Sequence, residues 1–120
     1  MYSQRLSRLA SMYTSLSYDE YNIGDILFTE FGYDAVLHNF YQIVGLTGTK
    51  TLIVQQVGST LVSMSDNADA NMGGGKEKPN TSRKIGQPFQ VRIGRTGTLR
   101  IEKNPAFKWD GKPLSFYNAH

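Results

Sequence analysis

Residues 89–101 read FQVRIGRTGTLRI, and this stretch decides the fold. Apolar side chains alternate with polar ones on both sides of Arg95-Thr96-Gly97, which is typical of two half-buried antiparallel strands. A three-residue loop with glycine in its left-handed last position closes such a hairpin through a bulge. That loop would set Ile93 opposite Leu99, so turn chemistry and hydrophobic pattern predict the same register.

The same register would place Arg92 directly opposite Arg100 on the solvent face. Like charges that face each other across a sheet are destabilising. A bound phosphate or carboxylate would turn this repulsion into a bidentate clamp, because guanidinium groups match the geometry of an oxyanion. The alternative is that Gln90, Glu102 and solvent relieve the pair. The first interpretation makes Arg92 and Arg100 candidate ligand-binding residues.

A second hairpin is predicted over residues 37–57. Its Gly48-Thr49 centre has glycine first, as a two-residue type II′ turn requires. Both faces of the two strands are apolar near the turn, which favours strands enclosed in a barrel or covered by a helix. The register of this turn pairs Phe40 with Val57, Ile43 with Val54 and Val44 with Ile53.

A third hairpin is predicted over residues 107–117, where Asp110-Gly111 is a strong type I′ turn signal. This turn would pair Phe107 with Leu114 on one face. Pro113 has no N–H to donate to a neighbouring strand, so its strand is expected at a sheet edge.

A helix is predicted before these strands, because apolar residues recur at helical spacing over residues 3–16, at Leu6, Leu9, Tyr13 and Leu16. Residues 23–31 then have the pattern of a strand that ends at a Gly32-Tyr33-Asp34 bend. Small and polar residues dominate 64–87, which predicts a long, mobile surface loop. The Gly73-Gly74-Gly75-Lys76 run in this loop lacks the Walker spacing, so a phosphate-binding loop is rejected there.

Together these segments predict one domain spanning residues 1–120, with a β core over about 23–63 and 88–117. The expected fold is mainly β: a small antiparallel β-barrel or strongly curved sheet of about six strands, with the N-terminal α-helix packed on it.

Composition excludes several classes of protein. The chain has no cysteine, so a disulfide scaffold, a thiolate zinc site and a cysteine nucleophile are all ruled out. No run of apolar residues is long enough for a membrane-spanning helix, and serines interrupt the start of the chain where a signal peptide would need an apolar core. We therefore expect the protein to remain in the cytoplasm.

Charge is distributed unevenly along the chain. Residues 1–75 contain three Lys or Arg against seven Asp or Glu, whereas residues 76–120 contain ten against three. A basic half of this kind suggests an anionic partner: an acidic protein surface, a nucleotide or a nucleic acid. The alternative is that the basic half only neutralises the acidic half within the fold.

Further candidate binding residues lie near the predicted turns. Trp109 stands beside Lys108 and Lys112, a combination that could stack a base or grip an acidic loop, with Lys103 nearby in sequence. The alternative is a Trp packed under the methylenes of Lys112. Tyr33, Asp34 and Tyr41 could line a pocket, and the alternative is that these residues satisfy a turn and the edge of the core.

The sequence contains few residues that are candidates for catalysis. His38 and His120 are the two histidines, so a metal site would need both of them and a distant carboxylate. Asp25, Glu30 and Asp34 could provide paired carboxylates, but their spacing does not favour this over solubility. We predict no catalytic residue, no metal and no cofactor, and therefore a protein that is not an enzyme.

Four motifs together resemble a family of small uncharacterised proteins of tailed phages and mobile elements: Gly24-Asp25-Ile26-Leu27, Gly32-Tyr33-Asp34, Phe40-Tyr41-Gln42-Ile43-Val44 and Trp109-Asp110-Gly111-Lys112-Pro113. The resemblance covers about residues 23–57 and 107–120. It departs at Phe31, where the family usually has Trp, and it carries no activity over to any residue.

What the resemblance implies is a genomic setting in which small proteins bind host targets. The leading hypothesis is a non-enzymatic phage-type accessory protein that inhibits a host defence system by binding a host protein or its nucleotide signal. The alternative is a nucleic-acid-binding module that uses the basic C-terminal half. An enzyme acting on a small phosphate compound is a third possibility, with no motif to support it.

Overall fold

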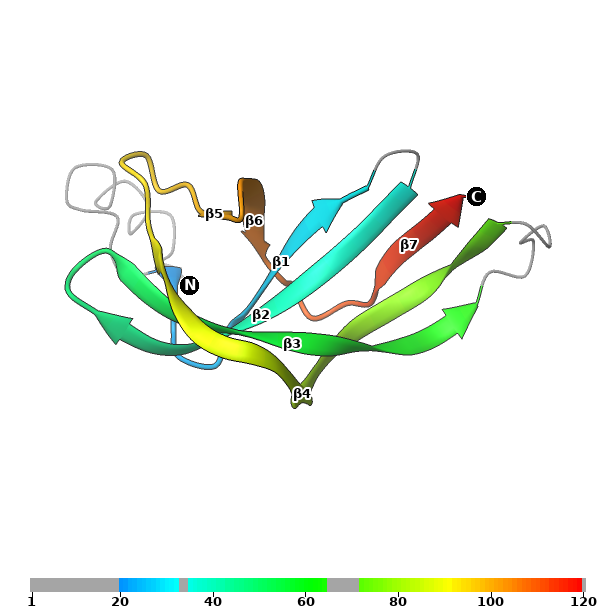
Figure 1. The fold of residues 1–120 in the computed structure, drawn as a ribbon, viewed down its shortest axis with the longest axis horizontal. Coiled ribbons are helices and arrows are strands. Elements are labelled where there is room, and N and C mark those ends of the chain that lie inside the picture. The colour runs from blue at the N-terminus through cyan, green and yellow to red at the C-terminus, as the bar shows by residue number, and fades with distance from the viewer. Residues whose placement is uncertain (1–19, 33–34, 65–71, 120) are drawn as a thin grey trace, which may run out of the picture.

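The computed structural model describes residues 20–32, 35–64 and 72–119, which form a single antiparallel sheet of seven strands (Figure 1). The strands are β1 (Ile26–Phe31), β2 (Ala35–Thr47), β3 (Thr51–Met64), β4 (Met72–Arg92), β5 (Arg100–Ile101), β6 (Asn104–Lys108) and β7 (Leu114–Ala119). Their order in the sheet is β3-β4-β7-β2-β1-β6-β5. The predicted helix over residues 3–16 lies outside the described residues.

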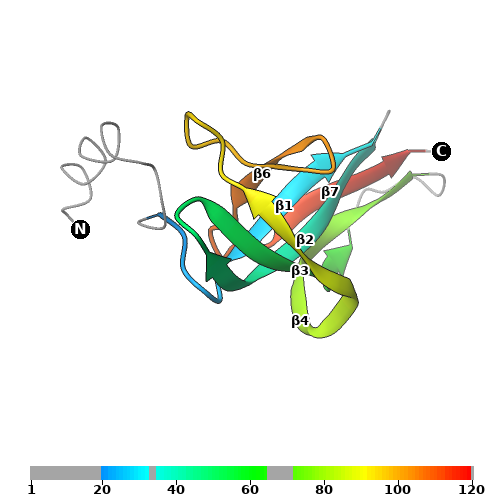
Figure 2. The same ribbon diagram turned by 60° about the vertical axis from the view of Figure 1, so that its left-hand side comes forward.

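The sheet curves into a partial ring. Strand β2 pairs with β1 along one edge and, along the other, with β3 and then with β7. Because β7 also pairs with β4, and β4 with β3, the four strands β2, β3, β4 and β7 close on one another (Figures 1 and 2). The predicted mainly β, strongly curved antiparallel sheet is confirmed.

The hairpin of β2 and β3 confirms two of its three predicted pairs. Phe40 lies opposite Val57 and Ile43 opposite Val54, but Ile53 faces Gly45. The loop has three residues, since Thr47 pairs with Thr51, and Gly48 has a φ of 66°. A β-bulge at Val44 takes up the extra residue and restores the predicted register beyond it.

The hairpin predicted over residues 89–101 is wrong as a strand pairing. Its loop forms, with Gly97 at a φ of 86° and a Gly94 N–H donating to the Thr98 carbonyl at 2.7 Å. Beyond the loop the two arms separate, because β4 pairs with β3 whereas β5 pairs with β6. Arg92 therefore faces Thr51 and Arg100 faces Pro105, and the predicted opposition of the two arginines is not found.

The third predicted hairpin is also wrong. The turn is present, with the Lys112 N–H donating to the Asp110 carboxylate at 2.9 Å and Gly111 at a φ of 93°. Its flanking strands do not pair with each other: β6 joins β1 and β5, whereas β7 lies between β4 and β2. The strand after Pro113, β7, is therefore not an edge strand. Pro113 lies before the first residue of β7, so its missing N–H does not interrupt the pairing.

The long loop expected over residues 64–87 is wrong for residues 72–87, which belong to β4. This polar segment is held by backbone pairing to β3 on one side and β7 on the other. Two glycines of the run face aromatic residues, Gly74 opposite Tyr117 and Gly75 opposite Phe116. An aromatic side chain beside a glycine compensates for the side chain that the glycine lacks in a strand.

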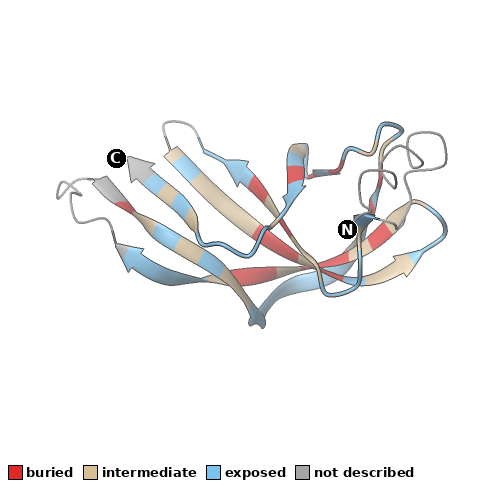
Figure 3. Cartoon of the chain, turned by 180° about the vertical axis from the view of Figure 1, so that it is seen from behind, coloured by how far each residue is buried: buried red, intermediate tan, exposed pale blue. Residues whose placement is uncertain are grey.

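The core is formed by the sheet together with the part of the chain that joins β4 to β6, and both carry buried residues (Figure 3). Its buried members come from six strands and from the loop before β5: Leu27, Tyr41, Ile43, Leu52, Val54, Val91, Ile93, Leu99, Ile101 and Ala106. Four apolar side chains of the 89–101 stretch are therefore buried as predicted, although their strands do not pair with each other, and Phe89 is partly buried.

Hydrogen exchange tests the assignment of β4 within a single strand. Amides of residues 74–77, which all pair with β7 and from residue 75 onward also with β3, should exchange slowly. Amides of residues 81–83 should exchange quickly, because no residue of β3 pairs with them between Asn80 and Lys84, where β4 swings outward (Figure 2). Equally rapid exchange over 74–77 would contradict the pairing.

Candidate anion-binding surface

Residues 92–103 place basic side chains on the surface above a buried apolar row. Arg92, Arg95, Arg100 and Lys103 are exposed. Ile93, Leu99 and Ile101, which lie between them in the sequence, are at most 4% exposed. The buried side chains anchor this segment to the core, so the cations are carried on a fixed backbone. We call residues 92–103 the basic segment.

The basic segment is also tied to the turn of the neighbouring hairpin. The Ile93 N–H donates to the Lys50 carbonyl at 2.6 Å. This hydrogen bond brings Lys50, from the acidic half of the chain, to the same end of the sheet as Arg92, which pairs with Thr51. Sequence reasoning missed Lys50, because the contact depends on the pairing of β3 with β4.

The turn between β5 and β6 is strained. Glu102 and Lys103 have φ values of 52° and 73°, in the left-handed region that favours glycine or asparagine. They are the two central residues of a tight turn, since Ile101 pairs with Asn104. The Arg100 guanidinium donates to the Lys103 carbonyl at 3.1 Å across this turn. Strain of this kind is concentrated at functional sites, which makes the turn a candidate contact point.

The other predicted cations lie around the turn after β6. The Lys108 ammonium is 3.4 Å from the Asp25 carboxylate and lies over the Tyr21 ring. The Trp109 indole is half-buried, packs edge-on against Phe40, and donates to the Lys112 carbonyl at 2.7 Å. Trp109 therefore helps to fix its own turn.

Tyr41, one of the two predicted tyrosines, lies in the buried core. Tyr41 is 1% exposed and packs edge-on against Phe89 within the core. Burial raises the pKa of its hydroxyl, which favours the neutral form. Tyr33 lies outside the described residues.

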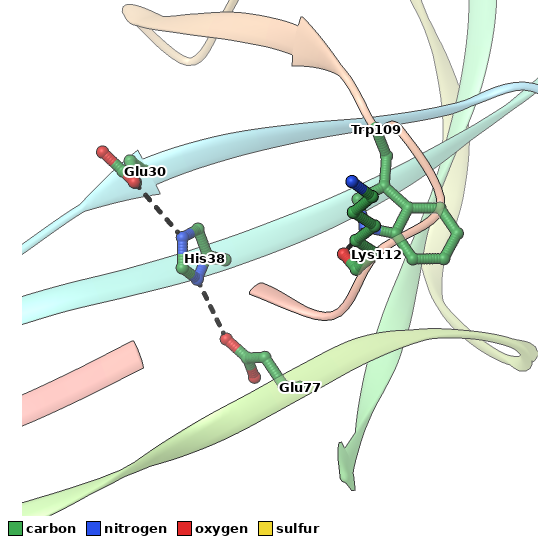
Figure 4. A network of polar contacts seen from close by, with 5 residues as sticks. All are labelled: Glu30, His38, Glu77, Trp109 and Lys112. Atoms are coloured by element: carbon green, nitrogen blue, oxygen red, sulfur yellow. Dashed lines mark hydrogen bonds and ion pairs between the residues drawn. The ribbon is translucent and has the colours of Figure 1, made fainter. Parts of the chain in front are cut away.

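A bridge centred on His38 was missed by sequence reasoning. One ring nitrogen of His38 is 3.1 Å from the Glu77 carboxylate and the other is 3.4 Å from the Glu30 carboxylate (Figure 4). The bridge joins β2 to β1 and, across the partial ring, to β4. The His38 side chain is 2% exposed and lies beside the rings of Phe28 and Phe40. Glu77 could not be expected as its partner, because residues 72–87 were not predicted as a strand.

This bridge does not have the geometry of a metal centre. The two carboxylates contact different nitrogens of His38, so they do not converge on one point. Among residues 20–32, 35–64 and 72–119, no group of three His, Cys, Asp or Glu side chains is arranged to hold a metal ion. The contacts instead make His38 a cross-link between strands.

Ion pairing within the described residues leaves most of the basic half without a carboxylate partner. Residues 76–120 contain ten Lys and Arg. Of these, Lys108 is the one that lies within ion-pair distance of an acidic side chain of the described residues, Asp25. No described ion pair involves a Lys or Arg of the basic segment. Direct pairing of the described residues therefore does not neutralise the basic half.

Comparison with known proteins gives no assignment: no family model, curated protein or solved structure matches the chain significantly. Among the described residues, no helix is long and apolar enough to cross a membrane.

Strain in the β5–β6 turn can be measured directly. Glu102→Asn combined with Lys103→Gly should raise the free energy of unfolding by about 1–2 kcal/mol, because Asn-Gly is the preferred sequence for two left-handed residues. Lys103→Gln removes the same lysine charge without relieving the backbone and should leave stability nearly unchanged. Urea denaturation of the three proteins checks this, and no gain in the Asn-Gly variant would contradict the strain.

Of the two contacts of His38, the one with the less exposed carboxylate should contribute more to the free energy of unfolding. His38→Ala leaves the Glu77 side chain, which is 14% exposed, without its partner, and should cost about 3–5 kcal/mol. Glu30→Gln changes a side chain that is 59% exposed and should cost less than about 1 kcal/mol. Equal losses in the two variants, measured by urea denaturation, would contradict the greater contribution expected from the less exposed contact of His38 with Glu77.

Proposed function

We propose that this protein is a non-enzymatic accessory protein of the phage or mobile-element kind, which binds an acidic surface of a host protein and so inhibits a host defence system. One observation indicates that the partner is anionic. The exposed cations of the basic segment alternate with buried apolar anchors and have no carboxylate partner among the described residues.

The arrangement of these cations favours a broad partner surface. Arg92, Arg95 and Arg100 occupy separate positions along an exposed segment, at the end of β4, in the following loop and in β5. Cations spaced in this way can each meet a different carboxylate, with arginine able to bind a carboxylate through two parallel hydrogen bonds. Such complementarity mainly accelerates association and selects the partner. The phage-type setting rests on the sequence resemblance alone.

A nucleic acid is the second candidate, because Trp109 lies between two lysines and Phe107 is 53% exposed on the neighbouring strand. Exposed aromatic rings with nearby cations suit the stacking of bases. The half-buried indole of Trp109 already uses its N–H within the turn, so we favour the acidic protein.

Charge removal from the basic segment tests the proposal. Arg92→Gln, Arg95→Gln and Arg100→Gln together should weaken binding to an acidic protein captured from host cytosol by at least about 1.5–3 kcal/mol, the range for one hydrogen bond to a charged group. The matched control carries Lys78→Gln, Arg83→Gln and Lys84→Gln, which removes the same charge from exposed positions elsewhere and should bind nearly as well as the parent. Affinity is measured by calorimetry.

Three results would count against this proposal. Equal weakening in both triple variants would indicate non-specific attraction, and unchanged affinity in both would make the arginines ordinary surface charge. Tighter binding to duplex or single-stranded DNA, with a steep loss of affinity as salt rises, would favour the nucleic-acid alternative.

A further inference from the structure

Lys76 lies between two serines in the middle of the paired strands. Ser63 of β3 is its partner on one side and Ser115 of β7 is its partner on the other. Residues directly opposite in a sheet project from the same face, with Cβ atoms about 4.5–5.5 Å apart. All three side chains are exposed. One ammonium and two hydroxyl groups are therefore presented together on this face.

A surface pocket of about 310 Å³ lies at this position. Gly74 is two residues before Lys76 and so lies on the same face, but it contributes no side chain. Its partner across the sheet is Tyr117, a residue that is 39% exposed. The lining consists of Ser63, Gly74, Gly75, Lys76, Ser115, Phe116 and Tyr117.

The donors of the pocket are side chains rather than backbone amides. Gly73, Gly74 and Gly75 are all paired with β7, so their backbone is engaged in the sheet and cannot form the cradle of a Walker loop. The lysine that follows the glycines is nevertheless at the pocket. The rejection of a Walker motif is thus consistent with an anion site that uses Lys76 differently.

The chemistry of the lining selects the ligand. It contains one cation, hydroxyl donors and two aromatic residues, and no acidic side chain. Ammonium and hydroxyl groups suit a phosphate, and an aromatic ring suits a planar base. The volume is at the lower end of the range for small-molecule sites, about 300–1,000 Å³, which fits one nucleotide.

We propose that this pocket binds a nucleoside monophosphate, with the phosphate at Lys76, Ser63 and Ser115 and the base beside Tyr117. The site lies near the start of β4. The basic segment begins at Arg92, the last residue of β4, at the opposite end of the sheet (Figure 1). It is therefore a second site, and it does not depend on the acidic partner proposed above.

Titration calorimetry with AMP, GMP, CMP and UMP tests the site, with inorganic phosphate and adenosine as separate arms. At least one nucleotide should bind with a Kd below about 1 mM. Lys76→Gln should weaken that binding at least about tenfold, and Ser115→Ala should weaken it several-fold. Lys78→Gln removes an exposed lysine from the same strand and should bind like the parent. Urea denaturation of each variant verifies that it is folded.

Several outcomes would overturn the proposal. These are no binding of any of the four nucleotides, equal weakening by Lys76→Gln and Lys78→Gln, or binding of inorganic phosphate as tight as that of the nucleotides. The variant with Arg92, Arg95 and Arg100 changed to Gln should bind the nucleotide normally. Failure of this site would therefore be distinguishable from failure of the acidic-partner proposal.

Discussion

The pairing of β2 with three other strands is the constraint on which the rest of the structure depends. Strand β1 follows one of its edges, whereas β3 and β7 share the other. A flat sheet would leave β7 and β4 without this connection, so the sheet must curve until β7 can meet both β2 and β4. His38 lies on β2, where its imidazole reaches Glu77 of β4 and reinforces the same closure.

This curvature also explains how the surface is built. Because the chain from β4 crosses the core to reach β6, Ile93 and Leu99 are buried and the intervening Arg95 is left outside. The polar start of β4 is meanwhile enclosed by β3 and β7, which places Lys76 between two serines. One long strand thus ends at Arg92 at one end of the sheet and presents Lys76 between the hydroxyl groups of its neighbours near the other end.

Local chemistry in the sequence predicted the turns well. Glycine at position 97 adopts the left-handed conformation, and the turn at Asp110-Gly111 is present. The hydrophobic pattern also identified buried residues such as Ile93 and Ile101. The bulge at Val44 was not predicted, since a two-residue and a three-residue loop at Gly48 are both compatible with glycine in first position.

What the sequence determined by itself was therefore the mainly β class, the positions of the turns and much of the core, because these follow from backbone preferences and from the alternation of apolar side chains. Only the tertiary structure decided which strands pair. Residues 72–80 show why: their backbone hydrogen bonds to β3 and β7 can be made by polar residues and glycine, and so leave no hydrophobic period in the sequence. The separation of Arg92 from Arg100, the contact of His38 with Glu77 and the grouping of Lys76 with Ser115 all follow from those pairings, which join residues far apart in the chain.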